Sequence, residues 1–214
     1  MRLYRFVRVI VYAVFRLLFR TRMMGTDNVP PEGAYLIVAS HRSLLDIPFA
    51  AFVTRRRVRF LAKRELFANV VLSKVFRTLG GIPVQRGEAD STALKACVAA
   101  LADGEPVAIF AEGTRHSGPT IKELYDGAAW MALRAGVPIV PVGIAGSEAI
   151  LAKGRVLPKF ERVAIVIGTP IDPGGSGPSG RSAKRADVTA VTGRLHVALQ
   201  QAFDEAGVLR TARR

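Results

Sequence analysis

Short apolar segments alternate with segments of helical periodicity along most of the chain. Several runs are almost continuously apolar and partly β-branched, which is typical of strands buried on both faces. These predicted strands are residues 35–39, 58–62, 82–84, 107–111, 138–144 and 163–167. Between them, apolar residues recur at helical spacing in residues 47–53, 65–79, 91–102 and 122–135. This alternation predicts a single α/β domain with a largely parallel central sheet flanked by helices.

The N-terminal segment has a different pattern. Residues 1–20 are mostly apolar but are interrupted by Arg2, Arg5, Arg8, Arg16 and Arg20. The longest uncharged run, residues 9–15, is far shorter than the roughly 20 residues of a membrane-spanning helix, and the interrupting arginines also argue against a signal peptide. On a helical wheel the arginines occupy an arc of about 120°, and most of the remaining face is apolar. We therefore predict an amphipathic helix lying in the lipid interface. The alternative is a helix that packs on its own domain and exposes a basic face.

These patterns divide the chain into four parts. Residues 1–24 are the predicted membrane-associating helix, and residues 25–168 are the α/β core. Residues 169–184 are rich in Gly, Pro and Ser and predict a flexible linker. Residues 185–214 predict a C-terminal helix with a basic tail, because apolar residues recur there at helical spacing at Val188, Val191, Leu195, Leu199 and Phe203.

Charge indicates an anionic partner. Lys and Arg total 31 against 17 Asp and Glu, a formal net charge of +14, which attracts the phosphate groups of lipids, small substrates or nucleic acid. A nucleic-acid-binding module is one alternative, supported by the run Arg55–Arg57. The aromatic residues lie within apolar runs and do not alternate with the basic ones, so we predict an anionic membrane surface as the partner and no nucleic acid.

Metal and disulfide chemistry are not expected. Cys97 is the only cysteine, and its place in an apolar helical stripe predicts a small buried side chain. The three histidines, His41, His116 and His196, are too widely separated for a zinc motif, and His196 borders an apolar helical stripe where a structural role is expected. We predict no metal site and no bound cofactor.

The strongest chemical signal directly follows the first predicted strand. His41 and Asp46 are five residues apart, and Pro48 lies where a helix would begin. A loop that turns into a helix would bring the carboxylate onto the imidazole, which fixes the tautomer and stabilises the imidazolium. No Gly-x-Ser-x-Gly nucleophile motif is present, so the histidine is predicted to activate a substrate hydroxyl directly. The alternative is a helix N-terminus at which His41 has no chemical role.

Further polar residues follow other predicted strands. Lys63 comes directly after residues 58–62, and Arg86 follows residues 82–84. Residues 112–115, Glu-Gly-Thr-Arg, follow residues 107–111. The carboxyl ends of parallel strands share one edge of a sheet, where sites of this architecture gather. Arginines at that edge are suited to binding a phosphate.

Four motifs in this order resemble the 1-acyl-sn-glycerol-3-phosphate acyltransferase family. The family patterns are His-x4-Asp, Gly-x-Ile-Pro-Val-x-Arg, Phe-Pro-Glu-Gly-Thr-Arg and Val-Pro-Ile-Val-Pro-Val, and the resemblance extends from about residue 28 to about residue 168. Gly127 and Ala128 also fit. Ala111 replaces the usual proline of the third motif, and Ser40 replaces the common asparagine before the histidine. Neither change removes a chemically active group.

The resemblance implies a role for each motif. His41 is similar to the family's general base, and Asp46 to the residue that orients it. The residues implied to bind the phosphate and glycerol of the acceptor are Lys63, Arg86, Glu112, Gly113, Thr114 and Arg115. The resemblance leaves the particular role of Lys63 open.

The function implied is transfer of a fatty acyl group, from acyl-CoA or acyl carrier protein as co-substrate, to a hydroxyl of lysophosphatidic acid or a related lysophospholipid. Glycerol-3-phosphate or a lysoglycolipid is an alternative acceptor, and a thioester or lipid hydrolase is an alternative reaction. The expected location is peripheral or monotopic, on the cytoplasmic face of the cell membrane. The sequence gives no prediction of the oligomeric state.

Overall fold

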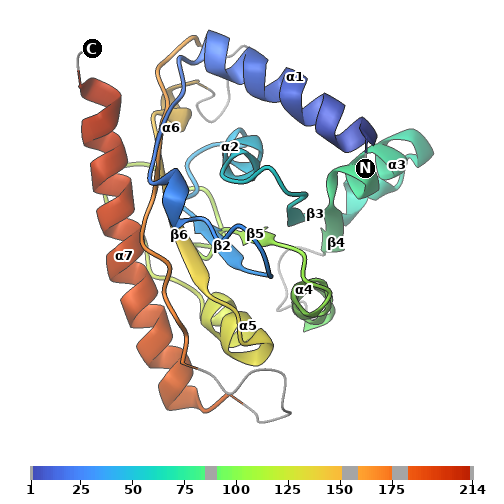
Figure 1. The fold of residues 1–214 in the computed structure, drawn as a ribbon, viewed down its shortest axis with the longest axis vertical. Helices are drawn as coiled ribbons and strands as arrows, with labels where there is room; N and C mark the ends of the chain where they lie inside the picture. Colours follow the sequence, from blue (N-terminus) through green and yellow to red (C-terminus); the bar gives the residue numbers. More distant parts are fainter. Residues whose placement is uncertain (1, 85–90, 151–158, 175–182, 213–214) are drawn as a thin grey trace.

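A seven-stranded sheet forms the centre of the molecule, with the strand order β1-β7-β6-β2-β5-β3-β4 (Figure 1). The computed structural model describes residues 2–84, 91–150, 159–174 and 183–212. The strands are β1 (Arg22–Met24), β2 (Leu36–Ala39), β3 (Arg59–Lys63), β4 (Gly81–Val84), β5 (Val107–Ile109), β6 (Ile139–Ala145) and β7 (Ala164–Ile167). The helices are α1 (Arg2–Leu18), α2 (Asp46–Phe52), α3 (Val70–Leu79), α4 (Ser91–Ala102), α5 (Gly127–Ala135), α6 (Ser147–Ile150) and α7 (Arg185–Thr211), with short 3₁₀ turns η1 (Thr26–Asn28) and η2 (Arg64–Phe67).

The sheet is largely parallel, as predicted. β6, β2, β5, β3 and β4 all run in one direction, while β7 is antiparallel to β6 and β1 is parallel to β7. β1 and β7 therefore form a reversed pair at one side of the sheet. The sequence pattern did not predict β1, because three residues with no β-branched member carry no recognisable strand signal.

Alternate residues of β2 face two different helix layers. Leu36 and Val38 pack with α4, α5 and α7, whereas Tyr35 and Ile37 pack with α1 and α2. Both faces of the strand are fully buried, which explains its uninterrupted apolar sequence. Helix α7 lies very close to β6, where a Cβ added at Gly143 would be 2.2 Å from the carbonyl oxygen of Ala202. A side chain at position 143 would push the helix away from the sheet.

Helix α1 packs across α2 through an aromatic cluster. The ring of Phe15 makes edge-to-face contacts with Phe19, Phe49 and Phe52, with centroids 5.1–5.5 Å apart. Arg8 lies on this inner side, where it donates to the carbonyl of Phe52, and burial lowers the pKa of its guanidinium. The arginine arc is therefore not wholly exposed, because it overlaps the flank that packs on α2.

The outer side of α1 carries both apolar and basic residues. Its exposed large apolar side chains are Phe6, Val9, Ile10, Val14, Leu17 and Leu18, and Arg16 is exposed as well. The helix packs on its own domain, as the alternative expected, while its insertion into a lipid interface stays a prediction. No helix within the described residues is both long and apolar enough to cross a membrane.

Two predicted helices begin later than their periodicity indicated. The predicted helix 65–79 divides into η2 and α3, and the side chain of Asn69 accepts hydrogen bonds from Val71 and Leu72 as the N-cap of α3. The predicted helix 122–135 begins only at Gly127 and ends, as expected, at Gly136 in the left-handed conformation. The predicted linker 169–184 lies partly outside the described residues, and Ile171 forms an antiparallel bridge with Ile139 of β6.

Candidate active site

The predicted site residues that the structure describes gather at one edge of the sheet. His41 follows β2, Glu112 follows the neighbouring strand β5, and Lys63 ends β3, the next strand along. These strands are parallel, so their carboxyl ends lie at the same edge. Arg86 follows the adjacent strand β4 by two residues and lies outside the described residues.

His41 and Asp46 are in contact, as the sequence predicted. The ring nitrogen Nδ1 of His41 is 3.2 Å from Oδ2 of Asp46, and the residues are 5% and 0% exposed. Asp46 is the first residue of α2, and its Oδ2 also accepts from the backbone N–H groups of Arg42 and Ser43 at 2.5 and 2.6 Å. Since this oxygen accepts from two N–H groups, it acts as an acceptor towards the imidazole as well. In the neutral imidazole the proton is therefore assigned to Nδ1, and Nε2 is the acceptor.

The backbone and ring of His41 are held from three further directions. Its N–H donates to Oε1 of Glu112 at 3.0 Å, and its carbonyl accepts from the N–H of His116 at 3.0 Å. The imidazole stacks on Phe110 with ring centroids 4.0 Å apart and planes 19° from parallel. Nε2 makes no hydrogen bond to any described residue, so it is the nitrogen left for a substrate.

A buried ion pair supports this arrangement. Nη1 of Arg42 lies 3.0 and 2.9 Å from the two carboxylate oxygens of Glu112, and its Nη2 donates to the carbonyl of Thr120. Arg42 also lies over the ring of Phe203 in α7, 4.8 Å from its centroid. Lys122 donates its backbone N–H to Oε2 of Glu112 at 3.1 Å. Both oxygens of Glu112 therefore have protein partners, and the residue is 2% exposed.

Sequence reasoning gave no role to Arg42. The only sequence signal was its position between His41 and Asp46. A cation at that position is as consistent with binding a substrate as with a structural role. The structure places it inward, in the loop that connects β2 to α2. Glu112 was predicted to contact the acceptor, and that contact stays a prediction. In the structure its carboxylate contacts Arg42 and backbone N–H groups.

The other candidate binding residues that the structure describes are exposed. Gly113, Thr114 and Arg115 form a short loop after Glu112, and Lys63 is exposed at the end of β3. Gly113 has φ of +71°, and an added Cβ would be 2.5 Å from the ring of Tyr125. The glycine is thus required both by its conformation and by the space available.

Cys97 and His196 have structural roles. Burial raises the pKa of the Cys97 thiol to about 12, so the thiolate needed for nucleophilic chemistry is absent near neutral pH. Nε2 of His196 lies 3.2 Å from the carbonyl of Ile121, which fixes α7 to the loop before α5. A cavity of about 1080 Å³ opens beside the site between this loop and α7, lined by Glu112, Thr114, His116, Ile121, Lys122, Glu123, Leu124, Tyr125, Asp126, Thr189, Thr192, Gly193 and His196.

Comparison with known proteins decides the family. Residues 20–145 match the family model described as Acyltransferase, and this range contains His41, Asp46 and Glu112. The chain belongs to the acyltransferase family. The resemblance found in the motifs is thereby confirmed, and the histidine–aspartate pair lies within the matched acyltransferase region.

Two bacterial relatives of this chain carry the same name. The 1-acyl-sn-glycerol-3-phosphate acyltransferase of Streptococcus pneumoniae is 33% identical over 151 residues, which are 69% of this chain and 54% of the relative. The Bacillus subtilis protein of the same name is 25% identical over 170 residues, 79% of this chain and 82% of the relative. The chain spans about half the length of the first curated relatives that it matches.

A solved structure shares the fold of this chain. The crystal structure of the 1-acyl-sn-glycerophosphate acyltransferase PlsC from Thermotoga maritima superimposes with a TM-score of 0.72 and 26% identity. The match covers 91% of this chain and 73% of that chain. It confirms the predicted α/β architecture with a mostly parallel sheet.

Proposed function

We propose that this protein transfers a fatty acyl group from a thioester donor to a free hydroxyl of lysophosphatidic acid or a related lysophospholipid. The observation that carries the proposal is the imidazole of His41, which is held by Asp46 with Nε2 unpartnered at an edge of the sheet that also carries exposed cations. The names of the relatives support the choice of acceptor. The donor is acyl-CoA or acyl carrier protein.

His41 acts as general base in the proposed reaction. Nε2 accepts the proton of the acceptor hydroxyl as its oxygen attacks the thioester carbonyl carbon. The tetrahedral oxyanion then collapses, the C–S bond breaks, and the thiolate leaves and takes up a proton. Asp46 stabilises the imidazolium formed in the first step. Base catalysis of this kind contributes about 10²–10⁴-fold, and the remainder comes from orientation and oxyanion stabilisation.

Exposed cations at neighbouring strand ends are proposed to bind the acceptor phosphate. Lys63 ends β3, which is two strand spacings from β2, or about 10 Å at the usual spacing. Arg115 is adjacent to His116, whose backbone contacts His41. Arg86 belongs to the same proposed set by its place after β4. The long basic side chains of Lys63 and Arg115 are proposed to contact the phosphate of an acceptor whose hydroxyl lies at Nε2.

The assay that tests the proposed function uses a panel of lysolipids with one radiolabelled acyl thioester. We expect labelled diacyl product with lysophosphatidic acid or a close relative, and little release of free fatty acid. Free fatty acid formed equally with and without acceptor would instead indicate the hydrolase alternative.

Replacing Lys63 by alanine is expected to raise the KM for the acceptor about tenfold, because one charge-assisted hydrogen bond to phosphate is lost. The KM for the thioester donor should stay within about twofold. The same result is expected for Arg86→Ala. Lys184→Ala, an exposed lysine at the start of α7, is the control. An equal rise in both KM values for Lys63→Ala would contradict a phosphate contact at this position.

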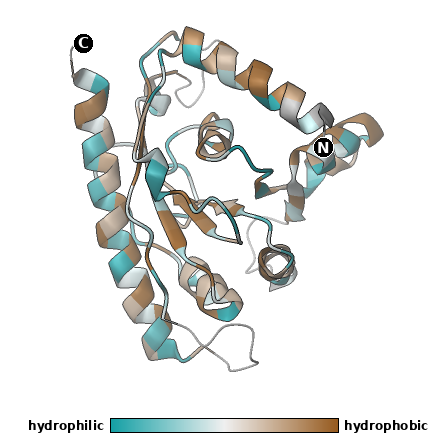
Figure 2. Cartoon of the chain, viewed as in Figure 1, coloured by the Kyte–Doolittle hydropathy of each residue, from teal (hydrophilic) through white to brown (hydrophobic). Residues whose placement is uncertain are grey.

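Membrane association is proposed to use α1 and α3 together. Figure 2 shows apolar positions along both helices, and α3 exposes Val70, Val71, Leu72 and Val75. Both helices contact the segment between α2 and β3, since Tyr4 of α1 donates to the carbonyl of Arg56 and Arg57 donates to the carbonyl of Arg77 in α3. Lys63 directly precedes η2, which leads into α3, so docking through α3 would bring Lys63 towards the lipid phase proposed to supply the acceptor. The cytoplasmic face is proposed because thioester donors are expected there.

The double variant Val9→Ser with Leu17→Ser is expected to weaken binding to neutral vesicles at least tenfold, because burial of each side chain contributes about 1.5 kcal/mol or more. These residues are 61% and 79% exposed. The matched control is Val197→Ser with Val208→Ser on α7, at 68% and 71% exposure. Vesicle sedimentation compares the two. Similar loss in both variants would show that α1 is not the docking surface.

A further inference from the structure

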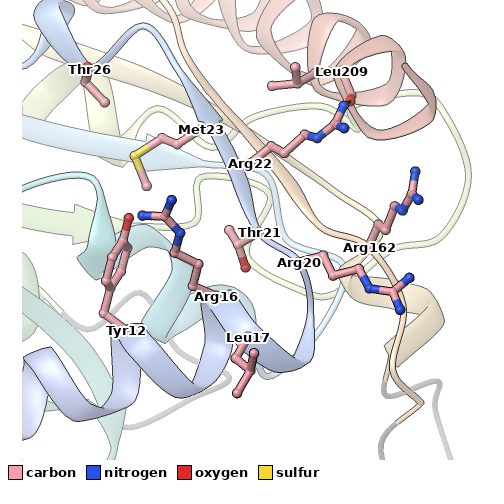
Figure 3. Close-up of a pocket in the computed structure, with 10 residues that line it drawn as sticks. All are labelled: Tyr12, Arg16, Leu17, Arg20, Thr21, Arg22, Met23, Thr26, Arg162 and Leu209. Carbon is pink, nitrogen blue, oxygen red and sulfur yellow. Dashed lines mark hydrogen bonds between the residues drawn. The ribbon is translucent and has the colours of Figure 1, made fainter. Parts of the chain in front are cut away.

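A second cavity lies away from His41, at the C-terminal end of α1 (Figure 3). Its volume is about 990 Å³, and its walls come from α1, β1, the segment before β7 and the end of α7. The lining residues are Tyr12, Arg16, Leu17, Arg20, Thr21, Arg22, Met23, Thr26, Arg162 and Leu209. We call it the arginine cavity.

The arginine cavity concentrates positive charge without a counter-ion from the protein. Four of its ten lining residues are arginines and none is acidic. Arg22 donates to the carbonyls of Leu209 and Ala212, which anchors it to the end of α7. Within the described part of the chain, the side chains of Arg16, Arg20 and Arg162 make no ion pair or hydrogen bond. In Figure 3 the side chain of Arg16 points towards Tyr12, whereas that of Arg20 extends on the side of Arg162, so unpaired cations lie at separate places along the cavity. Bound anions would relieve the repulsion between these charges.

The backbone conformation of Arg20 supports a binding role for this residue. Its φ is +44°, and among the described residues it is the one non-glycine residue with a positive φ. The left-handed conformation is disfavoured for a residue with a long side chain, and Gly or Asn is usual there. Strained residues of this kind concentrate at binding sites. In Figure 3 the Arg20 side chain extends on the same side as that of Arg162.

The arginine cavity adjoins the exposed apolar side chains of α1. Leu17 is 79% exposed and belongs both to the cavity wall and to the apolar outer side of the helix. If α1 lies in the lipid interface, the arginines one turn away lie at the depth of the lipid headgroups. Met23 and Leu209 supply apolar surface next to the charge.

The arginine cavity is separate from the catalytic pair but lies near the same edge of the sheet. Arg22 begins β1 opposite Ala164, which pairs with Ala145 at the carboxyl end of β6. β1 is three strand spacings from β2, about 14 Å at the usual spacing. A ligand held there would turn this edge of the molecule towards the bilayer.

We propose that the arginine cavity binds the phosphate-bearing headgroup of an anionic phospholipid. The proposal rests on the proposed membrane association and adds a specific headgroup site to it. Arginine forms bidentate hydrogen bonds with phosphate oxygens, and the neighbouring apolar side chains contact the lipid backbone. The site gives the protein a preference for anionic membranes that is independent of its catalytic residues.

The test compares two variants that each remove three positive charges. The cavity variant is Arg16→Gln, Arg20→Gly and Arg162→Gln. The matched control is Lys184→Gln, Arg185→Gln and Arg194→Gln in the N-terminal half of α7, all exposed. Sedimentation is measured with phosphatidylcholine vesicles and with mixed phosphatidylcholine–phosphatidylglycerol vesicles. The cavity variant should lose about fivefold in affinity for mixed vesicles per arginine removed, with unchanged affinity for neutral vesicles. Equal loss in the control would overturn the proposal and indicate a general charge effect.

The single variant Arg20→Gly distinguishes an effect on lipid binding from an effect on folding. Glycine adopts the positive φ without strain, so the melting temperature should stay the same or rise while the affinity for mixed vesicles falls about fivefold. Unchanged affinity would overturn the role of this arginine.

The source of the phosphate is distinguished by competition. Coenzyme A or inorganic phosphate should not displace the protein from mixed vesicles at the same ionic strength, and displacement by coenzyme A alone would overturn the lipid assignment in favour of the donor. Wild-type protein that binds neither kind of vesicle would instead refute membrane association itself. Acyl transfer to a detergent-dispersed acceptor should be the same in the cavity variant as in the wild type.

Discussion

Replacing His41 by alanine is expected to abolish acyl transfer, with a rate lower by about 10²–10⁴-fold and a protein that remains folded and still binds vesicles. The physical reason is that Nε2 is the unpartnered nitrogen of a ring fixed by Asp46 and stacked on Phe110. Single-turnover transfer with a radiolabelled thioester measures the loss. Removal of the imidazole leaves the backbone contacts of residue 41 with Glu112 and His116 in place.

His116→Ala is the matched control for this variant. Its backbone N–H, which donates to the carbonyl of His41, is retained, and among the described residues its side chain hydrogen-bonds only to Thr114. The control should keep most of its activity. If His41→Ala retained more than a few per cent of the wild-type rate, the imidazole would not be the base.

Glu112→Ala is expected to have the largest effect on stability. It leaves the guanidinium of Arg42 buried without its carboxylate partner, and loss of one member of a buried pair costs about 3–5 kcal/mol. For a chain of this length the melting temperature should fall by roughly 10 °C. Calorimetry or denaturant titration gives the value. Transfer activity should fall as well, because the N–H of His41 loses its acceptor.

The double variant Arg42→Met with Glu112→Leu tests whether the unpaired guanidinium of Arg42 causes the loss of stability. Replacing both charges with apolar side chains of similar size should restore much of the stability that Glu112→Ala loses. A Glu112→Ala protein that melts at the wild-type temperature and differs only in acceptor KM would contradict the positioning role. It would support the direct acceptor contact that the motif resemblance implied.

The sheet was predictable because its central strands are buried on both faces. In β2, each of the four residues Leu36–Ala39 is buried, so selection for apolar side chains leaves a continuous signal. The contact between His41 and Asp46 was also expected, since the chain turns into a helix between them and Asp46 is the first residue of α2. Both follow from local chain geometry and burial.

The ion pair of Arg42 with Glu112 was not predictable in the same way. The two residues are 70 positions apart, and nothing in either local pattern marks one as the partner of the other. Sequence patterns predict that charged residues face solvent or bind substrate. Only the tertiary structure shows that two such residues are buried together. The same reason explains Arg8, which the helical wheel grouped with the exposed arginines and which packs against Phe52.

The loop between Glu112 and His116 has a consequence for redesign of the proposed acceptor site. Both of its ends are attached to the backbone of residue 41, one through a carboxylate and the other through an amide. Substitutions at the exposed positions Thr114 and Arg115 should therefore alter which alcohol is accepted without moving the imidazole of His41. Inserting or deleting a single residue in this span would instead shift the imidazole, so natural or engineered diversity in acceptor choice should arise here by substitution at constant loop length.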